Sequence, residues 1–156
     1  MWPFKRKQLD INTLPSLSDD QQTWGVAEAG FGSSPLIIRY NESARNWIGH
    51  SELPIKLGFA IPLNSPNEGG LPYPDENEQL NEIEDIVVRE IASRSYGLHA
   101  LALTTGVMKE FVFYIPRNVD IKAIHESIQA TVDTHQVQCM AEMEPKWESY
   151  TQYAPQ

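Results

Sequence analysis

Hydrophobic residues recur along the chain with two periods, and these periods predict which segments are strands and which are helices. Over residues 55–61 apolar residues alternate with small or polar ones, as in a strand with one buried face. Residues 98–104 and 108–115 are apolar at almost every position, which is typical of strands in the middle of a sheet. Residues 137–144 alternate again, with one polar face. Together these segments predict the central strands of one sheet.

Two further segments carry apolar residues at the spacing of an amphipathic helix. The second of them covers residues 119–134. The first covers residues 75–94, directly after Pro74, and its acidic first turn favours a helix N-terminus. Its apolar stripe consists of Leu80, Ile83, Val87 and Ile91. We therefore expect both helices to pack one face against a sheet.

The N-terminal part of the chain is less regular. Residues 8–22 are polar with scattered leucines, which predicts an irregular lead-in with one helical turn at 17–21. Residues 23–29 and 35–40 predict two strands joined by a glycine- and serine-rich turn, and therefore a hairpin.

The order of elements predicts the fold class. From residue 55 it runs strand, helix, strand, strand, helix, strand, which is the pattern of the ferredoxin-like fold. We therefore predict an α+β protein with a ferredoxin-like antiparallel sheet, two helices on one face, and an N-terminal β-hairpin extension. The expected organisation is a lead-in over residues 1–22, a single domain over 23–150 and a C-terminal tail over 151–156.

Composition and charge narrow the possible functions. The chain has 156 residues, one cysteine and a formal net charge of −9, which argues against direct nucleic-acid binding and excludes an internal disulfide or a cysteine-based zinc site. Its four histidines lack metal-ligand spacing, so no metal or cofactor is expected. The basic residues 1–7 are not followed by an apolar signal region, and no apolar run is long enough to cross a membrane. These features predict a cytoplasmic protein.

Seven short segments, spread in a particular order over residues 22–150, carry a family resemblance. They are Trp24 with Glu28, Ile38–Asn41, Gly70–Pro72, Ile83–Asp85, Leu103–Gly106, Lys109–Tyr114 and Pro145–Tyr150. The chain resembles a bacterial family known only as domain of unknown function 695. It is also distantly similar to the protein regulators that bind and inhibit ribonuclease E. That second similarity implies a small, acidic, ferredoxin-like regulator that acts through protein contact.

The first predicted helix is strongly acidic, and this suggests a contact surface. Asp85 and Glu90 each have an arginine four residues later, so we expect two ion pairs, to Arg89 and Arg94. The remaining negative charge favours a basic protein partner, while a simply solvated helix face is the alternative. The residues proposed for partner binding are Glu78, Glu82, Glu84, Asp85 and Glu90.

Aromatic residues and one arginine suggest a different kind of site. A pocket with Arg39 as an anion anchor would use residues from several of the matching segments. The alternatives are that Trp147 packs back over the sheet, that the aromatic residues form an exposed protein-binding patch, and that His99 is an ordinary core histidine. The residues proposed for ligand binding are Trp24, Arg39, His99, Tyr114 and Trp147.

Two functional hypotheses follow. The first is a non-catalytic protein-interaction or regulatory domain, because no catalytic constellation is present and the first helix is acidic. The second is a small-molecule-binding or enzymatic domain with a pocket near Arg39, His99 and Tyr114. A deep pocket with convergent polar groups would favour the second hypothesis, and a flat acidic face would favour the first.

Overall fold

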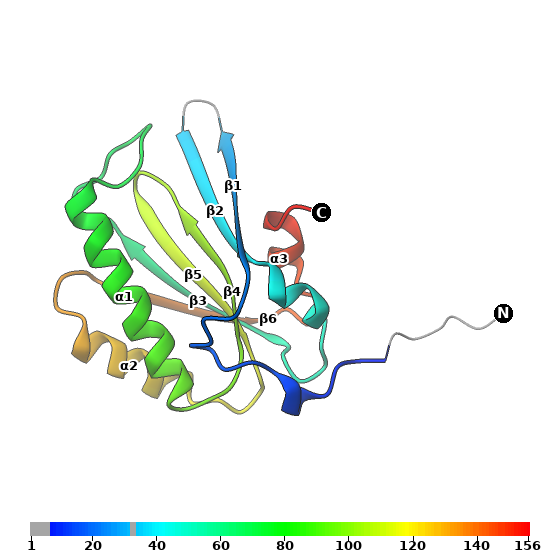
Figure 1. Cartoon of the computed structure of the whole chain (residues 1–156). Helices are drawn as coiled ribbons and strands as arrows, with labels where there is room; N and C mark the ends of the chain where they lie inside the picture. Colours follow the sequence, from blue (N-terminus) through cyan, green and yellow to red (C-terminus); the bar gives the residue numbers. More distant parts are fainter. Residues whose placement is uncertain (1–6, 32–33) are drawn as a thin grey trace.

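A computed structural model describes residues 7–31 and 34–156, and its main feature is one six-stranded antiparallel sheet (Figure 1). The strand order across the sheet is β1-β2-β4-β5-β3-β6. The strands are β1 Trp24–Phe31, β2 Ser34–Asn41, β3 Ile55–Pro62, β4 Leu98–Thr104, β5 Met108–Ile115 and β6 Gln138–Met143. This architecture confirms the predicted α+β class.

Helices α1 (Pro74–Ala92) and α2 (Ile121–Thr131) pack on one face of the sheet, where alternate strand residues form the larger core. The predicted stripe of α1 is fully or almost fully buried there. The strands contribute Leu57, Phe59, Ile61, Phe111, Phe113 and Ile115. Burial of these side chains fixes α1 and α2 on the sheet through the hydrophobic effect.

A second apolar cluster covers the opposite face at the β2–β4 side. It is closed by the 3₁₀ helix η2 (Glu42–Trp47) and by helix α3 (Glu148–Tyr153), which Figure 1 shows on the side away from α1. Its centre is aromatic: the rings of Tyr114 and Trp147 stack with centroids 4.0 Å apart. Strands β4 and β5, at the centre of the sheet, are therefore buried on both faces.

Three elements differ from the sequence-based prediction. Helix α2 is shorter than residues 119–134, because Asp120 caps its N-terminus and the backbone is extended at Val132. Residues 17–21 form turns instead of a helical turn, and the only regular structure in the described lead-in is the 3₁₀ helix η1 (Ile11–Thr13). Helix α3 was not predicted, because its six residues are too few to show a helical period.

Some expectations concern parts of the chain outside these elements. β1 pairs with β2 along its whole length, and the predicted turn between them includes residues 32–33, which lie outside the described residues, as does most of the basic segment 1–7. Among the residues that the structure describes, no helix is both long enough and apolar enough to cross a membrane.

Candidate functional site

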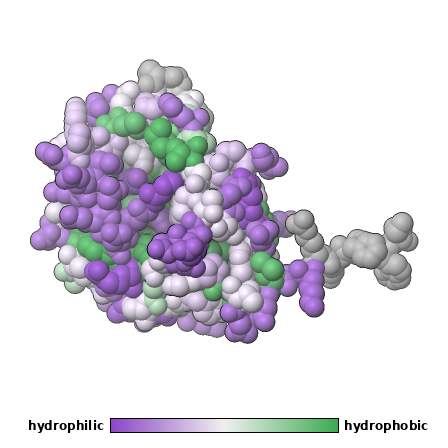
Figure 2. All heavy atoms as spheres, viewed as in Figure 1, coloured by the Kyte–Doolittle hydropathy of each residue, from purple (hydrophilic) through white to green (hydrophobic). Residues whose placement is uncertain are grey.

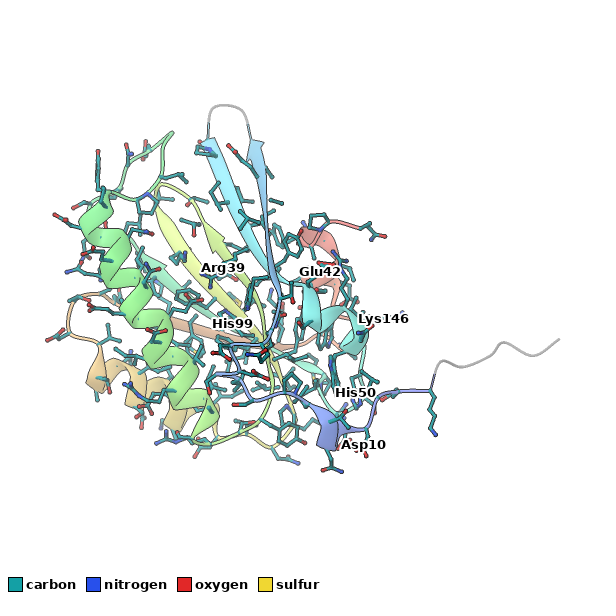
Figure 3. All side chains as sticks on the ribbon, viewed as in Figure 1. Asp10, Arg39, Glu42, His50, His99 and Lys146 are labelled. Atoms are coloured by element: carbon teal, nitrogen blue, oxygen red, sulfur yellow. The ribbon has the colours of Figure 1, made fainter. Side chains whose placement is uncertain are left out.

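An open cleft of about 790 Å³ lies between α1 and the strands at the β1 end of the sheet. Strands β1, β2 and β4 supply the floor, α1 supplies one wall, and the lead-in at 17–22 supplies the other. Figure 3 shows Arg39 and His99 between α1 and the strands of the floor. The lining residues are Leu17, Ser18, Asp19, Gln22, Trp24, Arg39, Glu84, Asp85, Val88, Arg89, Ala92 and His99.

A register shift in β4 turns His99 toward the cleft. The pairing of β4 with β5 slips between His99 and Leu101, so that His99 faces the α1 side while Ala100 and Leu101 belong to the opposite core. Such bulges are a recurrent way of re-aiming a side chain. The imidazole stacks on the ring of Phe113, its cross-strand neighbour on β5, with ring centroids 4.3 Å apart, and this contact fixes its orientation.

Arg39 is fixed at the cleft floor by two neighbours. Its guanidinium donates to the Glu84 carboxylate of α1, which ties β2 to the helix. The same guanidinium lies 4.9 Å from the centroid of the Trp24 ring on β1, within cation–π distance. The charge of Arg39 is therefore already balanced by the protein itself, and Arg39 is not a free anion anchor.

His99 has a buried nitrogen that forms no hydrogen bond with any described residue. The residue is 4% exposed, and the nitrogen concerned is its Nε2. The nearest carboxylate oxygen, Oε2 of Glu84, is 3.8 Å away, which is too far for a hydrogen bond. Such an orphaned group typically costs about 1–3 kcal/mol. A ligand that bonds to Nε2 would remove this cost.

The imidazole of His99 is neutral at pH 7. Burial is the main reason that its pKa falls to about 3, and the positive charges of Arg39 and Lys109 lower it further. A hydrogen bond with the backbone of Leu101 acts in the opposite direction but is outweighed. A neutral imidazole binds polar groups but does not attract anions.

Lys109 is a buried cation near this site that the sequence analysis did not single out. It is 7% exposed, and its ammonium lies 5.8 Å from the Phe111 ring centroid. Burial lowers its pKa most, Arg39 lowers it further, and Glu84 opposes the shift. The sequence does contain a sign of this residue: the other residues on the same face of β5, at every second position after Lys109, are all apolar.

Tyr114 and Trp147 are not part of the cleft. Both are fully buried in the core on the opposite face of the sheet. The indole N–H of Trp147 donates to the carbonyl of Leu53 at 2.9 Å, and the Tyr150 hydroxyl donates to the carbonyl of Asn41 at 2.6 Å. The structure thus brings together Trp24, Arg39 and His99, and gives Trp147 the packing role expected as its alternative.

The acidic residues of α1 fall into two groups. Glu84 pairs with Arg39, and Glu90 accepts from the Ser127 hydroxyl at 2.7 Å and from Arg94 at 3.1 Å, as expected for Arg94. Glu78, Glu82 and Asp85 are exposed. The predicted Asp85–Arg89 ion pair does not form within the described residues, which is unsurprising because exposed pairs gain little in water. Figure 2 shows hydrophilic residues over most of the α1 side.

The other chemically reactive side chains that the sequence offers have structural roles or form no cluster in the described residues. No group of three or more His, Cys, Asp or Glu side chains there is arranged to hold a metal ion. Burial raises the pKa of the Cys139 thiol to about 11, so it stays protonated and behaves as a small apolar side chain. His125 contacts the carbonyl of Val137 at 2.7 Å, which is a structural role.

The fold and the cleft together define an α+β protein with an open six-stranded antiparallel sheet and one polar-floored cleft beneath its long helix. Comparison with protein-family models matches residues 22–154 to the family described as "Family of unknown function (DUF695)". Because the match covers most of the chain, the protein belongs to this family, as the sequence resemblance implied. No curated protein and no solved structure matches the chain.

Proposed function

We propose that the protein is a non-catalytic binding domain whose ligand occupies the cleft between α1 and strands β1, β2 and β4. The observation that carries this proposal is the partnerless Nε2 of His99 at the cleft floor. Buried polar atoms in folded proteins almost always have hydrogen-bond partners, and a buried exception calls for an explanation. A ligand that supplies the missing partner is that explanation.

The chemistry of the cleft favours binding over catalysis. A histidine with a pKa of about 3 is a poor general base or acid at neutral pH, because efficient proton transfer needs a pKa near the working pH. Glu84 is engaged by Arg39 and is not free to act as a base. These residues hold a ligand without transferring a proton to it.

The lining of the cleft suggests the general form of the ligand. Leu17, Val88 and Ala92 offer apolar surface on the walls, and Trp24 adds an aromatic edge. The floor offers one free imidazole nitrogen and a charge pair that is already balanced. A group with an apolar body and an uncharged hydrogen-bonding head fits this arrangement.

We also infer that the ferredoxin-like unit and the regulatory role predicted from the sequence apply to this protein. The strand order β4-β5-β3-β6, with α1 and α2 against one face, supports the ferredoxin-like unit, and the pairing of β1 with β2 supports the hairpin extension. The distant similarity to ribonuclease E regulators supports a regulatory role in the bacterial cytoplasm through protein contact. In that case, the cleft is the natural place for the contact.

The proposal is tested by mapping where small molecules bind. Uniformly ¹⁵N-labelled protein would be titrated with acetamide, imidazole, indole and phenol, and the backbone amide shifts followed by NMR. The variants are His99→Phe, which keeps a flat ring on Phe113 but removes Nε2, and Ala92→Trp, which fills the cleft mouth at an exposed position. His125→Phe is the control, because His125 lies outside the cleft.

We expect the largest shifts at amides of the cleft lining in the wild type and in His125→Phe. In folded His99→Phe the hydrogen-bonding probes should lose at least fivefold in affinity, as for one hydrogen bond of about 1 kcal/mol. Ala92→Trp should weaken all four probes. Shifts that cluster away from the cleft, or no shifts with any probe, would contradict the proposal.

A further inference from the structure

We propose that the natural occupant of the cleft is a basic, extended segment of a partner protein, guided to the cleft by a row of acids on α1. This inference rests on the proposed function, because it assigns a ligand class to the same cleft. The acidic helix and the pocket, which supported two different functional hypotheses in the sequence, would then bind the same ligand.

The acid row consists of Asp75, Glu78, Glu82 and Asp85. Their spacing of three, four and three residues places them on one face of the helix, and all are exposed. None of them forms an ion pair with another described residue. At 1.5 Å per residue the row is about 15 Å long, which an extended peptide covers with about five residues.

The row is distinct from the acids that stabilise the fold. Glu76 is buried and accepts hydrogen bonds from the backbone N–H groups of Asn64 and Ser65. Glu84 and Glu90 are engaged by Arg39 and by Ser127 and Arg94. The free negative charge of the helix is therefore concentrated along one line.

That line ends at the mouth of the cleft. Asp85 lines the cleft itself, and Asp19 lines it from the lead-in on the other side. Against these two carboxylates the mouth has one arginine, Arg89, without an ion pair among the described residues. The mouth is thus net acidic in a chain of net charge −9, so a positively charged partner is steered toward it and nucleic-acid phosphates are repelled.

The floor of the cleft offers a hydrogen-bonding position for one uncharged side chain of the ligand, which the acid row alone does not provide. The Nε2 of His99, which has no hydrogen-bond partner among the described residues, belongs to the cleft floor, and the imidazole lies 4.9 Å from the Trp24 ring in a cleft that Val88 also lines. An uncharged side chain with a flat apolar body and a polar tip, such as tyrosine, fits this floor. The predicted ligand is therefore a tyrosine flanked by lysine and arginine residues.

The test is a binding assay with a fluorescently labelled seven-residue peptide that has a central tyrosine between lysines and arginines. Two peptide controls replace the tyrosine by phenylalanine, or every basic residue by glutamine. The row variant carries Glu78→Gln, Glu82→Gln and Asp85→Asn. Its matched control carries Glu126→Gln, Asp133→Asn and Glu148→Gln, which are exposed positions elsewhere with the same change in charge. Circular dichroism first establishes that each variant is folded.

We expect the row variant to bind the peptide about tenfold more weakly than the wild type, as for three ion pairs of about 0.5 kcal/mol each. The control variant should stay within twofold at the same salt concentration. Replacing the peptide tyrosine by phenylalanine, or His99 by phenylalanine in the protein, should each cost about fivefold, and together no more than either alone.

Three results would overturn the inference. Equal weakening by the row and control variants would mean unspecific charge attraction. Equal affinity for the tyrosine and phenylalanine peptides would mean that the cleft floor is not occupied. Absence of peptide binding, while the small probes still shift the cleft amides, would reject the basic segment and leave the binding cleft standing. If the small probes also fail, the proposed function fails with it.

Discussion

At the scale of single residues, His99 shows how one local irregularity creates a site. In a strictly alternating strand, His99 and Ala102 are three residues apart and would lie on opposite faces. The register shift between His99 and Leu101 lets both face α1. The imidazole is then buried against Phe113 and next to the positive charge of Arg39. Burial and charge together keep it neutral, and its free nitrogen faces the cleft.

A neutral buried histidine makes stability depend on pH. The native state takes up this proton only near its lowered pKa of about 3, whereas the unfolded state takes it up near the usual 6.5. The contribution of His99 is therefore complete above pH 6.5 and falls as the pH drops toward 3. Between pH 7 and pH 5 the wild type should lose about 2 kcal/mol through this residue.

Urea unfolding at both pH values, in the wild type and in His99→Phe, measures this effect. Arg39, Glu84, Lys109 and Trp24 surround the ring in both proteins, so the difference between them isolates the imidazole. The variant should lose about 2 kcal/mol less than the wild type on acidification. An equal loss in both proteins would show that His99 titrates normally in the folded state.

Trp147 is the second residue with a measurable contribution. It is fully buried, and its indole N–H donates to the carbonyl of Leu53. Trp147→Ala should lower the free energy of unfolding by about 3–5 kcal/mol. Trp147→Phe keeps most of the packing on Tyr114 and should cost about 1–3 kcal/mol through the unpaired carbonyl. Thermal or urea unfolding distinguishes these values from an unchanged stability, which would mean an exposed side chain.

At the scale of elements, the N-terminus of α1 is anchored by Glu76. Its carboxylate accepts from Nε2 of His135 at 2.6 Å and from backbone N–H groups of the loop after β3. Burial alone would raise the pKa of Glu76, but these hydrogen bonds outweigh it and lower the pKa. One side chain thus joins α1 to two loops.

Replacing this carboxylate tests the anchor. Glu76→Gln should reduce the free energy of unfolding at pH 7 by about 1–3 kcal/mol, whereas Glu78→Gln, two residues further along the same helix and exposed, should stay within about 0.5 kcal/mol. Because the native pKa is lowered from 4.5, the wild type should lose this contribution as the pH falls below about 4.5. A Glu76→Gln variant as stable as Glu78→Gln would contradict the anchor.

The sequence predicted long elements better than short ones. The continuous apolar runs at 98–104 and 108–115 and the periodic stripe of α1 extend over enough residues to be recognised in the sequence. Helix α3 and the register shift at His99 each involve too few residues to show a period in the sequence. Both depend on tertiary packing, around Trp147 and around Phe113. Local sequence does not contain that information.

At the scale of the whole molecule, the sheet separates a face that is filled by a second core from the face that carries the candidate cleft. The face under η2 and α3 is filled by aromatic residues, whereas the opposite face is covered by α1 and α2 and leaves the cleft open beside β2. Trp24, Arg39 and His99 were predicted to line one pocket, but the sequence did not reveal that Glu84, 45 residues from Arg39, lines the same cleft and pairs with Arg39. Only the packing of α1 brings them together.

Truncation should lower stability at the C-terminal end but not at the N-terminal end. Deleting residues 148–156 removes α3, including the fully buried Tyr150 and the 3% exposed Ala154, and uncovers the aromatic core. It should lower the melting temperature by more than 10 °C or prevent folding. Deleting residues 1–6 removes no periodic apolar stripe and should leave the melting temperature unchanged within error. Differential scanning calorimetry of both truncations compares them directly.

The most direct test of the binding cleft is the ¹⁵N NMR spectrum of ring-labelled histidine, recorded with and without the tyrosine-containing basic peptide. The account predicts that the His99 ring stays neutral down to pH 5, and that its Nε2 resonance has no hydrogen-bond shift in the free protein. It further predicts that this resonance moves on addition of the peptide, while those of His50, His125 and His135 do not. A His99 ring that titrates near pH 6.5 in the free protein, or an Nε2 resonance that stays fixed while the cleft amides shift, would contradict it.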